Sequence, residues 1–167
     1  LAQVIDELGD IDAKDQSGAI VADPDTLPAI NWQDVAQSLD GSAQEMDEAE
    51  RSAKRGLQAA KQAIKCFKLG DEPGISRRGR AASKRARRAN EILTDDYILN
   101  GRWMAAQNKR SARFEREARY LEDDPKALMR HNLMHYQQLL ASIEEAAGSL
   151  RPLYEAAAKK GRGQHNV

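Results

Sequence analysis

The sequence predicts an all-α protein, built as an up-and-down helical bundle or as elongated antiparallel helical hairpins, with an irregular acidic N-terminal arm. Three observations predict this class. Ala, Glu, Lys, Arg, Gln and Leu, which favour helices, fill long stretches of the 167 residues, and aromatic residues make up only 5%. Apolar residues recur three and four positions apart, and Gly, Asn or Pro separates the periodic stretches. The expected domains are an arm at 1–30, a helical domain at 31–160 and a tail at 161–167.

The arm at 1–30 carries little helical pattern beyond a short turn at 1–8. Gly9, Gly18, Pro24 and Pro28 interrupt an acidic stretch, which disfavours a continuous element. We expect the arm to lie on the protein's own basic helices, to lie on a neighbouring chain, or to have no fixed place.

Helical order is expected to begin at Asn31, a residue type that caps helix N-termini well. Asp40 and Gly41 are expected to end or kink this first helix, because glycine accepts the left-handed conformation that terminates helices. A longer helix at 43–69 then follows, and Gly70 ends it. Its apolar stripe consists of Met46, Ala49, Ala53, Leu57, Ala60, Ile64 and Phe67.

Two further helices, at 76–99 and 102–122, are predicted beyond a loop at 71–74. The apolar line of the first is Ala82, Ala86, Ala89, Leu93 and Tyr97. The second is expected to turn inward Trp103, Ala106, Phe114, Ala118 and Leu121. Trp103 and Phe114 are interpreted as core residues rather than as a platform for a ligand.

A fourth helix is expected to begin with Asp124 as N-cap and Pro125 at the first helical position. Pro152 should kink or restart this helix, because proline lacks a backbone N–H. The residues from 161 onward are expected to form a frayed tail. A heptad-spaced stripe consists of Tyr136, Leu139, Ile143, Ala146, Leu150, Leu153 and Ala157.

Alanine-rich seams let helices approach closely, but they bury little apolar area per residue. At about 25 cal/mol per Å² such a thin core contributes modestly, so neighbouring chains can supply the missing burial. We therefore expect a homo-oligomer or a part of a larger complex. Cys66 is the only cysteine and is expected to be a buried apolar filler, in a reducing compartment.

The balanced composition, with 26 basic and 26 acidic residues, conceals two opposed blocks. Residues 1–50 contain thirteen acidic side chains and one basic side chain. Residues 51–120 contain nineteen basic and seven acidic side chains. The overall charge of zero therefore says little about the partners of either block.

The strongest functional signal is the basic block, because the seven basic residues at 77–88 have no acid among them. A helix places this run along about 17 Å, and duplex DNA presents one phosphate per about 1.7 Å. Arginine also grips phosphates or carboxylates through two bonds. The candidate binding residues are Arg77, Arg78, Arg80, Lys84, Arg85, Arg87, Arg88, Arg102, Lys109, Arg110, Arg113 and Arg116.

This two-helix basic face predicts docking on a nucleic-acid backbone or on an acidic protein surface. A solvated face, or pairing with the protein's own acidic block, is the plainer alternative. Base-specific recognition is not expected, because the run lacks the amide and aromatic side chains that read or stack on bases. Binding should therefore depend strongly on salt.

No pattern in the sequence indicates an enzyme, a cofactor or a small-molecule substrate. His131 and His135 have a spacing that can ligate zinc, but Asn132 stands where a zinc protease needs its glutamate, so no metal is expected. The segment from Asp10 is rejected as a calcium loop, because Lys14 occupies a ligand position. No apolar run is long enough to span a membrane, and no secretory signal is evident.

Two functional hypotheses follow. The first is a non-catalytic helical component of a larger assembly, such as a nucleoprotein or viral particle, located in the cytoplasm or inside the particle. The second is a free-standing nucleic-acid-binding regulator whose acidic N-terminal third covers the basic helices. Deletion of the arm separates them, because a regulator should then bind nucleic acid more tightly and an assembly protein should lose self-association.

Overall fold

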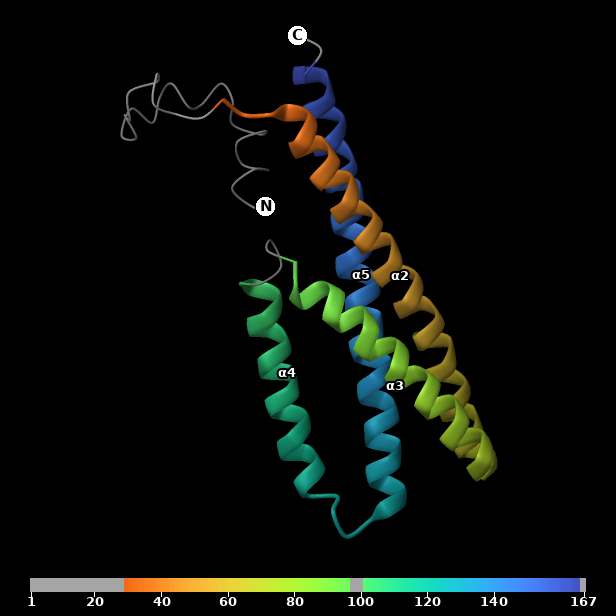
Figure 1. The fold of residues 1–167 in the computed structure, drawn as a ribbon. Helices are drawn as coiled ribbons and strands as arrows, with labels where there is room; N and C mark the ends of the chain where they lie inside the picture. The colour runs from red at the N-terminus through yellow and green to blue at the C-terminus, as the bar shows by residue number, and fades with distance from the viewer. Residues whose placement is uncertain (1–28, 97–100, 166–167) are drawn as a thin grey trace. The chain divides into compact units, whose positions relative to one another are not determined.

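The computed structural model describes residues 29–96 and 101–165, and this part of the chain contains four helices and no strand. They are α2 (Trp32–Leu69), α3 (Glu72–Thr94), α4 (Arg102–Arg119) and α5 (Pro125–His165) (Figure 1). The predicted all-α class is therefore confirmed. The predicted arm lies outside the described residues, apart from its last two positions.

The chain divides into two compact units, and α2 and α5 contribute residues to both. The smaller unit contains the residues up to Gln44 and those from Leu150 onward, and the larger unit is Glu45–Ser149. The domain boundaries predicted near residues 30 and 160 remain predictions.

The smaller unit pairs the first turns of α2 with the last turns of α5. Its buried residues include Leu39 from α2 and Tyr154 from α5, both with no exposed surface. Gly161 of α5 lies beside Ala36 of α2, since a Cβ atom at Gly161 would make an ordinary van der Waals contact, 3.4 Å from the Cβ of Ala36. Arg162 of α5 forms an ion pair with Asp40 of α2 at 2.6 Å. The start of α2 therefore packs against the end of α5.

In the larger unit, α2 is antiparallel to α3 and α5. The carbonyl of Arg85 in α3 accepts a hydrogen bond from Ser52 Oγ in α2 at 3.2 Å, and Arg88 pairs with Glu48 one turn earlier in α2. Residue numbers thus rise along α3 in the direction in which they fall along α2.

The other helices of the larger unit complete an up-and-down arrangement. The Tyr136 hydroxyl of α5 donates to Ser83 Oγ of α3 at 3.3 Å, and α3 runs parallel to α5. Gln107 of α4 donates to Ser142 Oγ of α5 at 3.2 Å, and α4 is antiparallel to α5. These directions are those of a helical bundle, in agreement with the predicted architecture.

The core of the larger unit is rich in alanine, as the sequence predicts. Cys66 is half-buried rather than fully buried, and packs against a cluster of Ala63, Ile75 and Leu133. The buried apolar residues are Met46, Ala49, Ala53, Ala60, Ala63, Ile75, Ala82, Ala86, Ala89, Ile92, Leu93, Leu133, Leu140, Ile143 and Ala147.

Asn31 caps α2 as predicted, with its Oδ1 accepting a hydrogen bond from the backbone N–H of Asp34 at 3.3 Å. The predicted break at Gly41 is wrong, because α2 is continuous across it. Nothing lies within 4 Å of the position that a Cβ at Gly41 would take. The hydroxyl of Ser42 donates to the carbonyl of Ser38 at 3.2 Å, one turn back, instead of capping a new helix.

Gly70 ends α2 as predicted, with a φ of 72° that glycine adopts readily. The predicted loop at 71–74 is wrong, because α3 begins at Glu72. The Asp71 carboxylate accepts the backbone N–H of Gly74 at 3.1 Å and caps the helix at once. Pro73 is tolerated because the first-turn N–H groups have no partner within the helix. The predicted end of this helix at 99 is wrong, because α3 ends at Thr94 with Asp95 as its C-cap. Tyr97 lies outside the described residues.

In α4, Gln107 is the one residue that is buried. Ala106, expected inside, is exposed, and Trp103, Phe114 and Ala118 are only half-buried. Polar and aromatic contacts therefore hold α4 against its neighbours. The sequence had predicted instead that a line of apolar residues would form a buried face of this helix. The predicted end of this helix at 122 is wrong, because α4 ends at Arg119, and the half-buried Leu121 lies beyond it.

Asp124 and Pro125 begin α5 as predicted, and the Asp124 carboxylate accepts the N–H of Ala127 at 3.1 Å. The predicted restart at Pro152 is wrong, because α5 continues through it. The helix also extends to His165, over most of the segment expected to be a frayed tail. Leu153, expected in the core, is 60% exposed, and Tyr154 beside it has no exposed surface.

Candidate nucleic-acid interface

Four exposed basic residues lie along one face of α3 and are named the α3 basic line: Arg77, Arg80, Lys84 and Arg87. These side chains lie on the side of the helix opposite the buried alanines, as the spacing predicts. None of the four forms an ion pair or hydrogen bond with another described residue. Each guanidinium or ammonium group is therefore available to an external anion.

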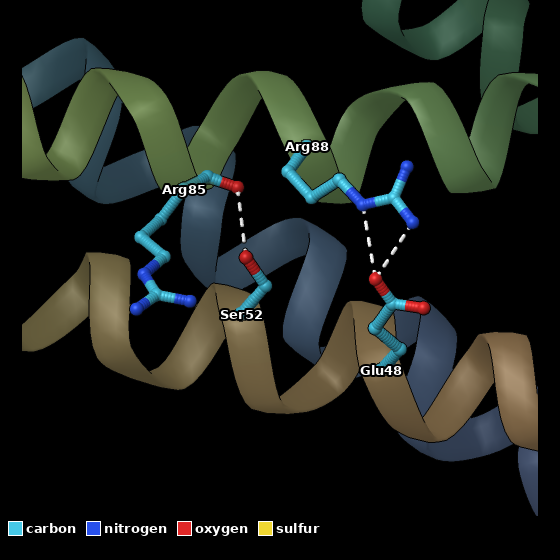
Figure 2. A network of polar contacts seen from close by, with 4 residues as sticks. All are labelled: Glu48, Ser52, Arg85 and Arg88. Carbon is cyan, nitrogen blue, oxygen red and sulfur yellow. Dashed lines mark hydrogen bonds and ion pairs between the residues drawn. The ribbon is translucent and has the colours of Figure 1, made fainter.

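Arg88 lies at the edge of the same helix, and its positive charge is already paired with an acidic residue of the protein. Its Nε and Nη2 atoms donate to Glu48 Oε1 of α2 at 2.9 and 2.7 Å (Figure 2). The hydrogen bond and the charge of Glu48 raise the pKa of Arg88. A residue of the protein's own acidic block, Glu48, thus forms an ion pair with one of the predicted binding residues, Arg88.

Arg78 and Arg85 lie on the flank of α3 that faces α2. Arg78 is half-buried and donates to Gln62 of α2. Arg85 is exposed, and its carbonyl accepts the Ser52 hydroxyl (Figure 2). Its Cβ would lie 2.8 Å from a Cβ added at Gly56, which shows how closely α3 approaches α2.

The basic residues of α4 are divided between two places. Lys109, Arg110 and Arg113 line a pocket of about 360 Å³ shared with α5, named the α4–α5 pocket. Arg102 and Arg116 are exposed and are not among its lining residues.

A second pocket, of about 330 Å³, is lined by residues of α3, α4 and α5. Of the twelve predicted binding residues, only Arg87 lines it. Asn90, Asn108 and Ser111 line it too, so neutral polar groups lie where the two helices meet. The use of both basic helices as a single binding face stays a prediction.

The side-chain amides of Asn90 and Asn108 were missed by the sequence reasoning, which found no amide side chain within the basic run itself. They come from the end of α3 and the middle of α4, and only the packing of the two helices places them beside Arg87. For Asn90, the signal available in the sequence was its position three residues after Arg87, which places both residues on the same side of a helix.

His131 and His135 both stack against an aromatic ring of α4. The Phe114 ring stacks on both imidazoles, with centroids 4.7 Å from His131 and 4.0 Å from His135. Burial, and then the charges of His131 and Arg110, lower the pKa of His135. No group of three potential metal-ligating side chains occurs in the described ranges.

A groove of about 1360 Å³ in the larger unit lies where α2 ends and α3 and α5 begin. Phe67, Met129 and Met134 provide apolar surface, and the two methionines are 42% and 38% exposed. Its basic residues are Lys61, Lys68, Lys126 and Arg130, and its acidic ones are Glu72 and Asp124. The sequence reasoning missed this groove, because its lining comes from three helices that only the tertiary packing brings together.

No protein-family model, curated protein or solved structure matches this chain. Among the residues that the structure describes, no helix combines the length and apolar character that a membrane crossing needs.

Proposed function

We propose that this chain is a non-catalytic helical component of a larger assembly and docks on a nucleic-acid backbone through the α3 basic line. The exposure of Arg77, Arg80, Lys84 and Arg87 on one face carries this proposal. The four positions extend over about 15 Å of helix, which matches several successive phosphates. A nucleoprotein or viral particle is the setting that this activity suits.

Backbone docking fits these residues better than base recognition does. The α3 basic line contains three arginines and one lysine, and such side chains bind phosphates without regard to sequence. Affinity should therefore be similar for unrelated nucleic-acid sequences and should fall steeply with salt.

Replacing the α3 basic line with Gln at all four positions should weaken binding to every DNA or RNA sequence tested. Each phosphate contact that is lost should reduce the slope of log affinity against log salt by about 0.9 for duplex DNA. Fluorescence anisotropy over a salt series measures both quantities. The matched control removes four exposed charges elsewhere, at Arg55, Lys65, Lys159 and Lys160.

Unchanged affinity of the α3 variant at low salt would remove the nucleic-acid proposal. An equal loss in the control variant would also remove it, since general charge rather than the α3 face would then explain binding. Loss of binding to polyglutamate but not to DNA or RNA would instead assign the α3 basic line to an acidic protein surface.

The assembly part of the proposal is supported by the large groove beside Phe67, Met129 and Met134. We propose that the acidic N-terminal segment of a second copy occupies it. In that segment Leu1, Val4, Ile5 and Leu8 are spaced for one helical face, and acidic residues fill the positions around and after them. The four basic side chains of the groove outnumber its two acids, which complements this charge.

Deleting residues 1–28 should lower the mass of the particle in solution, and high salt should lower the mass of the full chain because it screens this attraction. Light scattering after size exclusion, at low and high salt, measures the change. Unchanged mass together with tighter nucleic-acid binding would contradict assembly and support the autoinhibited regulator. A peptide of residues 1–28 should compete with self-association, and a scrambled peptide of equal charge is the control.

A further inference from the structure

The α4–α5 pocket has basic side chains on both of its walls. Lys109, Arg110 and Arg113 come from α4, and His131 and His135 come from α5. Lys109 and Arg113 are exposed, while Arg110 and the imidazoles are half-buried. Five basic side chains from two helices therefore surround a volume of about 360 Å³.

The acidic side chain of this pocket does not balance that charge. Glu117 accepts a hydrogen bond from Arg113 Nε at 2.9 Å and lies 3.8 Å from His131 Nε2. Lys109 and Arg110 form no ion pair within the described part of the chain. The pocket is thus left with uncompensated positive charge.

Arg110 also has an unused hydrogen-bond donor. Its Nη1 atom is buried and has no hydrogen-bond partner among the described residues. Burial of an arginine donor without a partner costs free energy, and the planar guanidinium suits two oxygens of one anion. A tetrahedral oxyanion that enters the pocket would therefore supply an acceptor that the folded chain does not.

The imidazoles are held in place before any ligand arrives. Phe114 stacks on His131 with ring planes 3° apart and on His135 with planes 24° apart. His131 Nε2 also lies 3.3 Å from the Phe114 carbonyl oxygen. Two aligned rings on one helix thus form a rigid wall of the pocket.

We propose that the α4–α5 pocket binds a single phosphate group, with Arg110 and Lys109 as its main charge partners and His135 as a donor when protonated. The site is separate from the α3 basic line and does not depend on nucleic-acid docking there. The phosphate belongs to a small molecule, inorganic phosphate or a nucleotide, or to the end of a nucleic-acid strand.

Binding of phosphate should be accompanied by uptake of a proton, because the negative charge of the anion offsets part of the repulsion that disfavours the protonated form of His135. Burial, and then repulsion from His131 and Arg110, lower the pKa of His135, and the pocket also brings Lys109, Arg113 and Glu117 near it. Arg87 of α3 lines the neighbouring pocket with His135 and adds to the positive field. A bound phosphate should raise the pKa of His135, so affinity should increase as pH falls through its titration.

Nuclear magnetic resonance of the imidazole protons, titrated with inorganic phosphate, tests the site. Saturable shifts at His131 and His135 are expected, and Arg110→Gln should weaken the affinity at least about tenfold, as loss of one charged hydrogen bond does. Arg116→Gln is the matched control, because it removes the same charge from the same helix outside the pocket. Sulfate, whose charge is constant over the relevant pH range, should bind more tightly at lower pH.

Absence of saturable shifts at millimolar phosphate would overturn the proposal, and so would equal losses in Arg110→Gln and Arg116→Gln. Circular dichroism checks that Arg110→Gln folds, and Lys109→Gln provides an exposed second variant that should also weaken binding. A variant with Gln at Arg77, Arg80 and Lys84 only, which leaves Arg87 in place, should keep its phosphate affinity, which separates this proposal from the proposed function.

Two ligand arms then distinguish the sources of the phosphate. Tighter binding of an oligonucleotide with a 5′-phosphate than of the same strand without it would assign the site to a strand end. Tighter binding of a free nucleotide than of either strand would assign it to a small molecule. Binding of both strands with equal strength and no competition from phosphate would overturn the single-phosphate site.

Discussion

Gly56→Leu is expected to destabilise the larger unit by about 3 kcal/mol, near the upper end of the range for over-packed cores. A Cβ atom at this position would lie 2.7 Å from Leu140 Cδ2 of α5 and 2.8 Å from Arg85 Cβ of α3. Both distances are shorter than side chains tolerate, and the Arg85 atom is fixed to its backbone. The glycine therefore allows α2, α3 and α5 to approach one another closely.

Gly41 provides the matched comparison, since it lies in the same helix with nothing within 4 Å of the position of a Cβ atom. Gly41→Ala should raise the free energy of unfolding by up to about 1 kcal/mol, because alanine favours the helix and restricts the unfolded chain. Urea unfolding followed by circular dichroism measures both changes. Stabilisation by Gly56→Leu would contradict the close approach of the three helices.

These two glycines show which parts of the fold the sequence could predict. Local signals predicted the caps at Asn31 and Asp124 and the stop at Gly70, because each depends on neighbouring residues. The same reasoning placed a break at Gly41, where helix propensity and packing carry α2 through. Nothing local distinguishes Gly56, whose role depends on Leu140 more than eighty positions away.

The candidate site divides in the same way. Alternation of alanine and arginine predicted the exposed α3 basic line, because both faces belong to one helix. Local spacing could not predict that Glu48 pairs with Arg88, forty residues apart. The α4–α5 pocket also depends on tertiary packing, which places Arg110 beside His131 and His135.

The stripe of α5 shows the limit of spacing as a guide to burial. Ile143 and Leu150 are buried as predicted. At three other predicted positions, Leu139, Ala146 and Leu153, the buried residue is the next one along the chain: Leu140, Ala147 and Tyr154. Spacings of three and four fit either residue of each pair, so only the tertiary packing decides which one lies in the core.

Tyr154→Ala is therefore expected to destabilise the smaller unit by about 3 to 5 kcal/mol, as deletion of a buried aromatic side chain generally does. Tyr154 has no exposed surface and is among the largest fully buried side chains described. Leu153→Ala, one position earlier and 60% exposed, should change the free energy of unfolding by no more than about 0.5 kcal/mol. Urea unfolding of the two variants, followed by circular dichroism, measures this difference. A larger loss in Leu153→Ala than in Tyr154→Ala would restore the heptad stripe and contradict the packing of α5 against α2 in this unit.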